Sequence, residues 1–182
     1  MKKGQAKGAK KKYALIDAEG NIKVIGFETI RGDWSLIAKE VQQTVLDIIL
    51  RDEDKEKAFA YVQDIIRNVH TKEIPLEKMV IQKQLRKDIS AYETVGPHVA
   101  VARMMQEKGD FMGAGALIKY IITEGKGIIR ERAKPLDEAK DYDAEYYIHH
   151  QIIPSVKSIF EVLGISKDLL ASKHPQSSLR DF

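Results

Sequence analysis

Two short apolar runs near the N-terminus constrain the fold of this 182-residue chain more than any other feature. Residues 13–17 and 22–27 are apolar and partly β-branched, and the residues between them read Ala-Glu-Gly-Asn, which is typical of a tight turn. This pattern predicts a β-hairpin. No comparable run lies nearby to extend the sheet, and a two-stranded hairpin alone is marginally stable in water. We therefore expect the hairpin to complete a sheet found elsewhere.

Beyond the hairpin, apolar residues recur at helical spacing over much of the chain. A long amphipathic helix is expected after Asp33, whose side chain can cap the first N–H groups of that helix. Further helices are expected over residues 55–69, 98–108 and 143–163. Pro154 is expected to kink the last of these, because proline lacks the N–H that continues a helix.

Two segments between the helices have strand-like composition. Residues 79–85 can form a short strand or an irregular apolar segment. Residues 116–123 and 127–134 predict a second hairpin that turns at Glu-Gly-Lys, residues 124–126. The predicted fold class is therefore α+β, mostly helical.

Composition excludes several classes of protein. The absence of cysteine excludes a disulfide scaffold, a thiol nucleophile and a thiolate metal site. No apolar run approaches the span of a bilayer, and the Lys-rich start lacks the apolar stretch of a secretory signal. We therefore expect a soluble, cytoplasmic protein without a membrane partner.

The positive charge is concentrated at one end of the chain. The first 12 residues contain six lysines and no acid, so the other 170 residues carry a net charge of −3 although the whole chain carries +3. A short basic arm rich in Gly and Ala cannot fold alone and suits a polyanion. A leader that only improves solubility remains an equal alternative.

No residue cluster indicates a catalytic centre. Asp141, Asp143 and Glu145 are metal-ligand types, but acids just before a helix are expected from its dipole. His149 and His150 are adjacent and cannot chelate one ion as an i, i+4 pair would. We therefore expect no cofactor or metal bound by this chain.

Five stretches, taken in order, resemble one known family. They are residues 10–13 (Lys-Lys-Lys-Tyr), 31–34 (Arg-Gly-Asp-Trp), 96–99 (Gly-Pro-His-Val), 125–133 and 142–154. Together they resemble the C-terminal palm edge and thumb of a family B DNA polymerase in its archaeal form, over roughly residues 10–175.

The resemblance implies a domain organisation. Residues 1–12 would be a basic flexible arm and 13–32 a palm-edge hairpin that completes a partner's sheet. Residues 33–171 would form a helical thumb domain with a small β-hairpin, and 172–182 a tail.

The family's catalytic carboxylate motifs, Asp-x-x-Ser-Leu-Tyr and Asp-Thr-Asp, do not occur in the sequence. Some archaea encode this polymerase as two polypeptides, and the chain resembles the smaller one. A nucleotidyltransferase built in this way would hold Mg²⁺ in the active site of a large catalytic subunit, because two-metal phosphoryl transfer needs clustered carboxylates. We therefore expect the chain to be inactive alone.

The resemblance also implies that eight residues contact DNA: Lys10, Lys11, Lys12, Tyr13, Arg31, Lys87, Tyr92 and His98. Lys11, Lys12 and Tyr13 would lie under the primer end, where minor-groove acceptors are nearly the same for all base pairs. Arg31 and Asp33 would brace the start of the thumb helix, and the last three would contact phosphates of the emerging duplex. Arg86, Glu93 and Ile128 stand where the family usually has Thr, Lys and Arg.

The C-terminal tail resembles a peptide that binds the sliding clamp. Gln176, Leu179 and Phe182 match the pattern Gln-x-x-aliphatic-x-x-aromatic, and a second aromatic does not follow Phe182. On a helix with three residues per turn, Leu179 and Phe182 eclipse and form one apolar plug.

Three hypotheses follow. The leading one is a small polymerase subunit that grips primer–template duplex, with the large catalytic subunit, DNA and the sliding clamp as partners. The second is a non-enzymatic DNA-binding adaptor tethered to the clamp. The third is a degenerate fragment without function.

Overall fold

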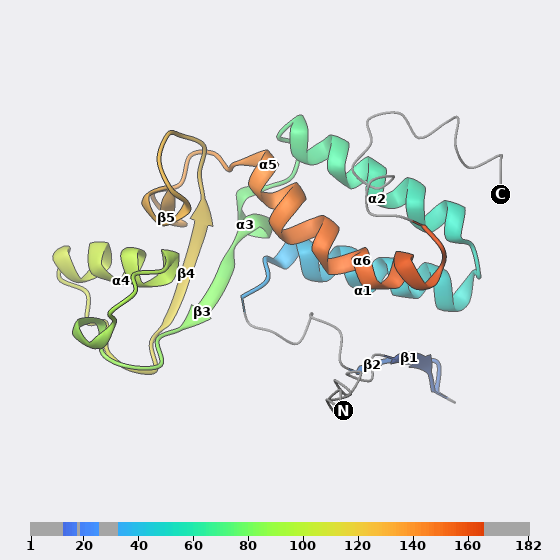
Figure 1. The fold of residues 1–182 in the computed structure, drawn as a ribbon, viewed down its shortest axis with the longest axis horizontal. Coiled ribbons are helices and arrows are strands. Elements are labelled where there is room, and N and C mark those ends of the chain that lie inside the picture. Colours follow the sequence, from blue (N-terminus) through green and yellow to red (C-terminus); the bar gives the residue numbers. More distant parts are fainter. Residues whose placement is uncertain (1–12, 18, 26–32, 166–182) are drawn as a thin grey trace, which may run out of the picture.

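A computed structural model of the chain describes residues 13–17, 19–25 and 33–165. It confirms a mostly helical α+β fold with a small antiparallel sheet of three strands (Figure 1). Within the described ranges, every helix is too short or too polar to cross a membrane.

The helices and strands follow one another in a simple order. The first half contains β1 (Tyr13–Ile16), β2 (Ile22–Ile25), α1 (Leu36–Arg51), α2 (Lys55–His70), α3 (Leu76–Met79) and β3 (Ile81–Gln84). The second half contains η2 (Ile89–Ala91), α4 (Pro97–Glu107), β4 (Leu117–Ile122), η3 (Ile129–Glu131), β5 (Ala133–Pro135), α5 (Ala144–Tyr147), the π-helical turn Ile148–Ile152 and α6 (Ile153–Val162).

Strands β1 and β2 form the predicted N-terminal hairpin, with Tyr13 opposite Ile25. The Asp17 carboxylate closes the turn by accepting a hydrogen bond from the backbone N–H of Asn21 at 2.8 Å. Gly20 has φ +83°, a backbone conformation that side chains disfavour. Among the described residues, no third strand pairs with this hairpin.

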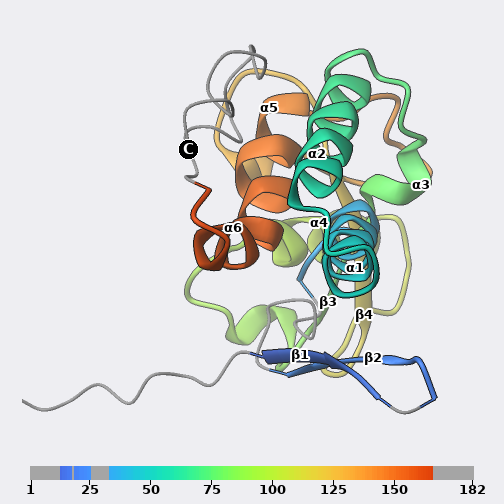
Figure 2. The same ribbon diagram turned by 90° about the vertical axis from the view of Figure 1, so that its right-hand side faces the viewer.

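The hairpin forms a separate layer below the helices (Figure 2). Arg51, at the end of α1, donates a hydrogen bond from Nη2 to the carbonyl of Gly20 at 2.7 Å, and its Nε lies 2.6 Å from a carboxylate oxygen of Asp47. Ala14 packs against the core. The hairpin thus contacts the helices both through its turn and through β1.

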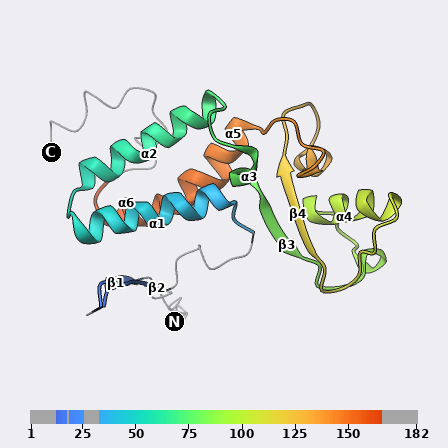
Figure 3. The ribbon, with the colours of Figure 1, turned by 180° about the vertical axis from the view of Figure 1, so that it is seen from behind.

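Helices α1, α2 and α6 run side by side and form a bundle (Figure 3). Their apolar faces meet in a core that includes fully buried Val41 and Val45 of α1. Phe59 of α2 and Phe160 of α6 pack edge to face, with ring centroids 6.3 Å apart. The helical spacing seen in the sequence therefore corresponds to the faces that the bundle buries.

The start of α1 differs from the prediction. Ser35, not Asp33, is the N-cap, because its Oγ accepts a hydrogen bond at 3.4 Å from the N–H three residues later. The N–H of Ser35 donates to the buried Oε1 of Gln151 at 2.8 Å, so a long-range contact sets where the helix begins. Asp33 instead faces β3, with Oδ2 3.8 Å from Lys83 Nζ.

The sheet β3–β4–β5 and α4 form a second unit, here called the tip, at one end of the bundle (Figure 1). Ile81 of β3 lies opposite Tyr120 of β4, and Ala133 of β5 lies opposite Ile122 of β4. Helix α4 packs on β4 and β5. Residues 79–85, which the sequence left open, thus supply an edge strand of this sheet.

The second hairpin is confirmed, but its second strand is shorter than predicted. The strand begins at Ala133 because the preceding residues curl into a short 3₁₀ turn. The Glu131 carboxylate accepts a hydrogen bond from the N–H of Ile128 at 3.3 Å, and Gly127 has φ +105°. Both features bend the segment away from an extended conformation.

The expected helix over residues 143–163 is present but irregular in its centre. A π-helical turn over Ile148–Ile152 separates α5 from α6, and Pro154 lies in the first turn of α6. Proline cannot donate to the carbonyl four residues earlier, and a π turn accommodates such a local loss of regular bonding. The interruption therefore lies just before the proline.

Asp143 joins the tip to the bundle. Its N–H donates to the carbonyl of Ile122 on β4 at 2.9 Å, and its Oδ1 accepts from the N–H of Tyr146 at 3.0 Å, which caps α5. Its Oδ2 forms an ion pair with Arg132, and both side chains are less than one-fifth exposed. Burial raises the pKa of the Asp143 carboxyl, but the hydrogen bond from Tyr146 and the Arg132 guanidinium lower it, and together they hold this pKa below its ordinary value.

Replacing Asp143 tests this junction. Asp143→Asn keeps a capping oxygen but removes the negative charge, so we expect a loss of about 1 to 3 kcal/mol in the free energy of unfolding at pH 7. A carboxyl whose pKa is lower in the folded than in the unfolded state stabilises the fold at pH values above its unfolded pKa, which is 3.8 for Asp143. This stabilisation is lost as the pH falls through the folded pKa.

The difference between wild type and Asp143→Asn, measured by denaturant unfolding, should therefore shrink below pH 3.8. Asp64→Asn is the matched control, because Asp64 pairs with Arg67 at 2.6 Å with both side chains more than half exposed. Equal effects of the two substitutions at pH 7 would contradict the role of the junction.

Candidate nucleic-acid interface

A cleft of about 490 Å³ lies between the edge strand of the tip, the segment that follows it and the N-terminus of α4. Its walls also include Asp33, which precedes the start of α1, so the cleft lies where bundle and tip meet. It is lined by Asp33, Lys83, Gln84, Arg86, Lys87, Tyr92 and His98.

The cleft is cationic. Lys83, Arg86 and Lys87 contribute three positive charges, and Asp33 is the one acid among the lining residues. Lys83 and Asp33 lie 3.8 Å apart, too far for a close hydrogen bond, and both are more than two-fifths exposed. The positive charge of the cleft is therefore largely available to an anion from solution.

Tyr92 organises the segment after β3. Its hydroxyl accepts a hydrogen bond at 2.8 Å from the backbone N–H of Arg86, which closes the loop on itself. Lys87 Nζ lies 5.0 Å from the centre of the Tyr92 ring, a cation–π geometry. The ring also meets His98 edge to face, with centroids 5.9 Å apart. Tyr92 therefore contacts both Lys87 and His98 within the cleft.

A second tie holds this loop against the start of β4. The Asp88 carboxylate accepts a hydrogen bond from the N–H of Ala114 at 3.1 Å. The N–H of Leu85 donates to the carbonyl of Ala116 at 2.8 Å, which continues the pairing of β3 with β4. The cationic side chains thus project from a supported loop.

His98 is buried in the first turn of α4, and its Nδ1 has no hydrogen-bond partner. Burial lowers the pKa of His98, and the positive charge of Lys83 lowers it further, while Asp33 acts in the opposite direction. The imidazole is therefore neutral at pH 7.

The N-terminus of α4 also favours an anion. The N-cap is Gly96, which provides no side-chain hydrogen bond, and Pro97 at the first helical position has no N–H. The N–H of Val99 donates to the carbonyl of Gly96 at 3.0 Å, so what this 11-residue helix offers an anion is mainly the positive end of its dipole. A Cβ at Gly96 would lie 3.4 Å from two atoms of the His98 ring. A residue without a side chain thus lets the imidazole lie against the helix start.

The structure brings together three of the eight residues expected to contact DNA. Lys87, Tyr92 and His98 line one cleft, although they come from separate elements. Tyr13 lies on β1 in the hairpin and is 44% exposed. The remaining expected contacts lie outside the described residues: Lys10, Lys11, Lys12 and Arg31, and in the tail Gln176, Leu179 and Phe182.

Sequence reasoning missed two cations of the cleft. Lys83 lies opposite Ile118 in the β3–β4 pairing, on the strand that the sequence left open as irregular. Arg86 stands out in the sequence only as a departure from the family pattern. No local pattern marks either residue as part of a site, because the cleft forms only where the edge strand and the segment after it meet the start of α4.

The acids near α5 have structural partners. Asp143 caps the helix, as the dipole argument expected, and Asp141 accepts a hydrogen bond from the N–H of Glu124 at 3.3 Å. Glu145 lies 3.2 Å from His149 and 3.6 Å from His70. Across the part of the chain that the structure describes, no group of three or more His, Cys, Asp or Glu side chains could hold a metal ion.

Comparison with known proteins connects these features to one family. The family model described as DNA polymerase family B matches residues 8–163. A DNA polymerase of Thermococcus kodakarensis is 44% identical over 163 residues, which is 87% of this chain and 10% of that protein. A DNA polymerase of Thermococcus sp. (strain 9oN-7) is 43% identical over 175 residues, which is 93% of this chain and 23% of that protein.

A solved structure shares the fold. The family B DNA polymerase from the hyperthermophilic archaeon Pyrobaculum calidifontis matches with a TM-score of 0.73 and 36% identity, over 87% of this chain and 21% of that one. The chain thus spans between about a tenth and a quarter of the length of these relatives. Because the family model covers most of the sequence, the chain belongs to DNA polymerase family B.

Proposed function

We propose that this chain grips primer–template duplex as the thumb and palm edge of a family B DNA polymerase. In this proposal it is the small polypeptide of a split enzyme whose catalytic part lies on another chain. The observation that carries the proposal is the cleft between β3 and α4, where Lys83, Arg86 and Lys87 surround Tyr92 and His98.

The chemistry of the cleft suits a phosphate backbone rather than a particular base sequence. Lysine and arginine side chains and a helix N-terminus bind phosphate oxygens, which are the same for every sequence. A polymerase must hold any duplex that it has made, so contacts of this kind fit the task.

The exposed face of the hairpin supports the palm-edge role. Tyr13, Leu15 and Ile25 are between 36% and 44% exposed, although all three are large and apolar. A two-stranded sheet gains stability when further strands or another layer cover such a face. The proposal assigns this cover to the sheet of the catalytic polypeptide. The same face argues for the polymerase subunit over the DNA-binding adaptor, which would have no sheet to complete.

The proposal assigns the catalytic carboxylates and Mg²⁺ to the large subunit, because neither carboxylate motif of the family occurs in this sequence. The role of this chain is then to position the primer end. The proposal also includes binding of the sliding clamp by Gln176, Leu179 and Phe182, and this part rests on the spacing of the tail alone.

The cationic cleft is tested by substituting two of its lysines. Lys83→Ala with Lys87→Ala should weaken binding of the full chain to duplexes of unrelated sequence by the same factor. The slope of log affinity against log salt should fall by about 2, roughly one for each phosphate that the variant no longer neutralises.

Lys157→Ala is the matched control, because Lys157 lies on α6 outside the cleft and is about half exposed. It should leave both affinity and slope nearly unchanged. A double variant whose salt slope equals that of wild type would refute the proposed role of the cleft.

The neutral state of His98 predicts a pH dependence of binding. A bound phosphate favours the imidazolium, so the pKa of His98 should be higher in the complex than in the free chain, where it lies below 6.5. Duplex affinity should therefore rise as pH falls toward and below 6.5, by up to about tenfold per pH unit.

His98→Gln should flatten this rise, measured by fluorescence anisotropy between pH 7.5 and 5.5. His149→Gln is the control, because His149 lies in the π-helical turn outside the cleft. The free chain should lose stability as the pH falls over the same range, because His98 binds the proton more readily in the unfolded state than in the folded state. Binding is therefore measured well below the melting temperature. A pH profile shared by His98→Gln and wild type would exclude this coupling.

The split-enzyme proposal is tested by primer extension. The purified chain should extend no primer, and extension should appear when the polypeptide that carries the two carboxylate motifs is added. Leu15→Lys, on the exposed hairpin face, should reduce this rescue, because it introduces a charge where the partner's sheet would pack. Lys23 lies directly opposite Leu15 on the same face of the hairpin, and Lys23→Arg, which keeps the charge already present there, serves as the control. Extension by the purified chain without a partner would contradict the assignment of catalysis.

A further inference from the structure

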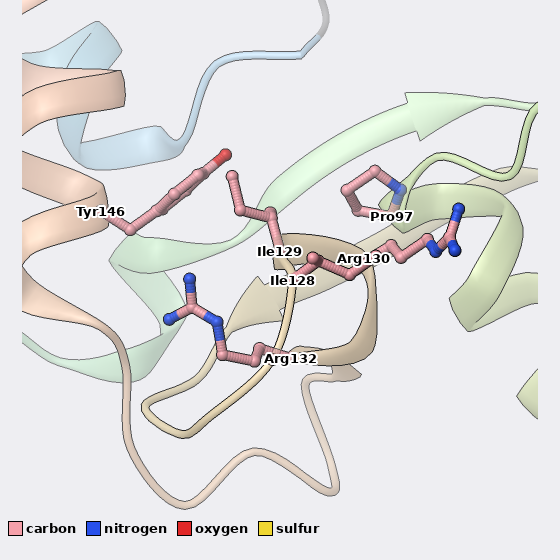
Figure 4. Close-up of a pocket in the computed structure, with 7 residues that line it drawn as sticks. Pro97, Ile128, Ile129, Arg130, Arg132 and Tyr146 are labelled. Carbon is pink, nitrogen blue, oxygen red and sulfur yellow. The ribbon is translucent and has the colours of Figure 1, made fainter.

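A second cavity, of about 560 Å³, lies beside the cationic cleft. The two share the start of α4, because Pro97 lines the second cavity and His98 lines the cleft. Figure 4 shows the second cavity, which is lined by aliphatic side chains of the loop between β4 and β5, by Tyr146 and by Arg132. Arg130 extends from the same loop past Pro97 (Figure 4).

The aliphatic wall is held in place by its loop. Ile128 is 52% exposed, which is unusual for a large aliphatic side chain on a supported turn. The Glu131 carboxylate accepts the N–H of Ile128 at 3.3 Å, and a Cβ at Gly127 would lie 2.5 Å from Glu131 Oε2. Glycine therefore permits the close approach that fixes Ile128. The supported loop thus presents this side chain to solvent.

The lining favours a sugar over a base. Pro97, Ile128 and Ile129 offer aliphatic carbon, which packs against the carbons of a deoxyribose. The aromatic side chain of the cavity, Tyr146, already has one ring face in contact with another ring. His150 stacks on it with ring centroids 5.3 Å apart, and the ring also meets Tyr147 edge to face.

We propose that this cavity seats one deoxyribose of the strand whose phosphates lie in the neighbouring cleft. This inference rests on the proposed function, since it requires duplex to be bound there. Arg130 would pair with a phosphate next to that sugar, while Pro97 and Ile128 would contact its apolar 2′ carbon. A ribose would place a 2′-hydroxyl against aliphatic carbon, so the seat discriminates DNA from RNA at one position of the strand.

A single-ribonucleotide scan tests the inference. The full chain is titrated with a series of DNA duplexes, each with one ribonucleotide at a different position of either strand. One position should bind about threefold to tenfold more weakly than all-DNA duplex, because a polar group without a partner disfavours an apolar seat. A single ribonucleotide leaves the rest of the duplex as DNA, so the phosphate contacts are maintained.

Ile128→Thr should abolish the discrimination, because threonine keeps the β-branched shape and provides a partner for the 2′-hydroxyl. Ile128→Val should keep it, since the wall stays aliphatic. Val162→Thr is the matched control, because Val162 is an exposed aliphatic residue on α6 outside both cavities, and it should leave the scan unchanged.

Two results would overturn the inference while leaving duplex binding intact. One is a wild-type scan in which every position binds equally, and the other is a discrimination that persists in Ile128→Thr. A chain that shows no salt-dependent duplex binding at all would instead overturn the proposed function, and the deoxyribose seat with it.

Discussion

The ion pair between Arg132 and Asp143 fixes the tip against the helical bundle, and the proposed interface depends on that arrangement. Asp143 accepts from the first turn of α5 while its own N–H donates to β4, so one residue belongs to both units. Helix α4 packs on β4 and β5 and is therefore positioned by the same junction. Asp33 from the bundle side and Lys83 from the tip meet in the cleft only because the two units are held together.

The distribution of charge favours the cleft over the rest of the surface as the place where an anion binds. Outside the first 12 residues the chain is slightly acidic, yet the cleft gathers three cations around a single acid. A polyanion is therefore attracted to the cleft and weakly repelled by much of the remaining surface. In our proposal, the cavity on the other side of Pro97 adds a mainly apolar part to this surface, which would contact a sugar beside the phosphates.

Local patterns predicted the elements whose stabilisation is local. The apolar spacing of α1, α2 and α4 and the turn chemistry of the first hairpin each depend on residues close in sequence, and all four were found. The N-cap of α1 was misassigned because Ser35 is held by Gln151, more than a hundred residues away. The identity of β3 as a strand depends on its pairing with β4, which no local pattern reports.

The candidate site shows the same division. Lys87, Tyr92 and His98 were identified through a family resemblance. Lys83 was identified only from the structure, in which it lies on β3 and lines the same cleft as His98. The cavity beside Ile128 was also missed, because an exposed isoleucine in a turn has no distinctive sequence pattern. Its proposed role rests on the loop geometry, in which Glu131 bonds to the N–H of Ile128 and Gly127 has a positive φ.

Amide hydrogen exchange of the full chain with and without duplex DNA tests the central claim most directly. The account predicts added protection in residues 85–92, at the start of α4 and in the loop over 127–131, with little change in α2 and α6. Protection confined to the bundle helices, or no protection at saturating duplex, would contradict the assignment of the cleft as the DNA-binding surface.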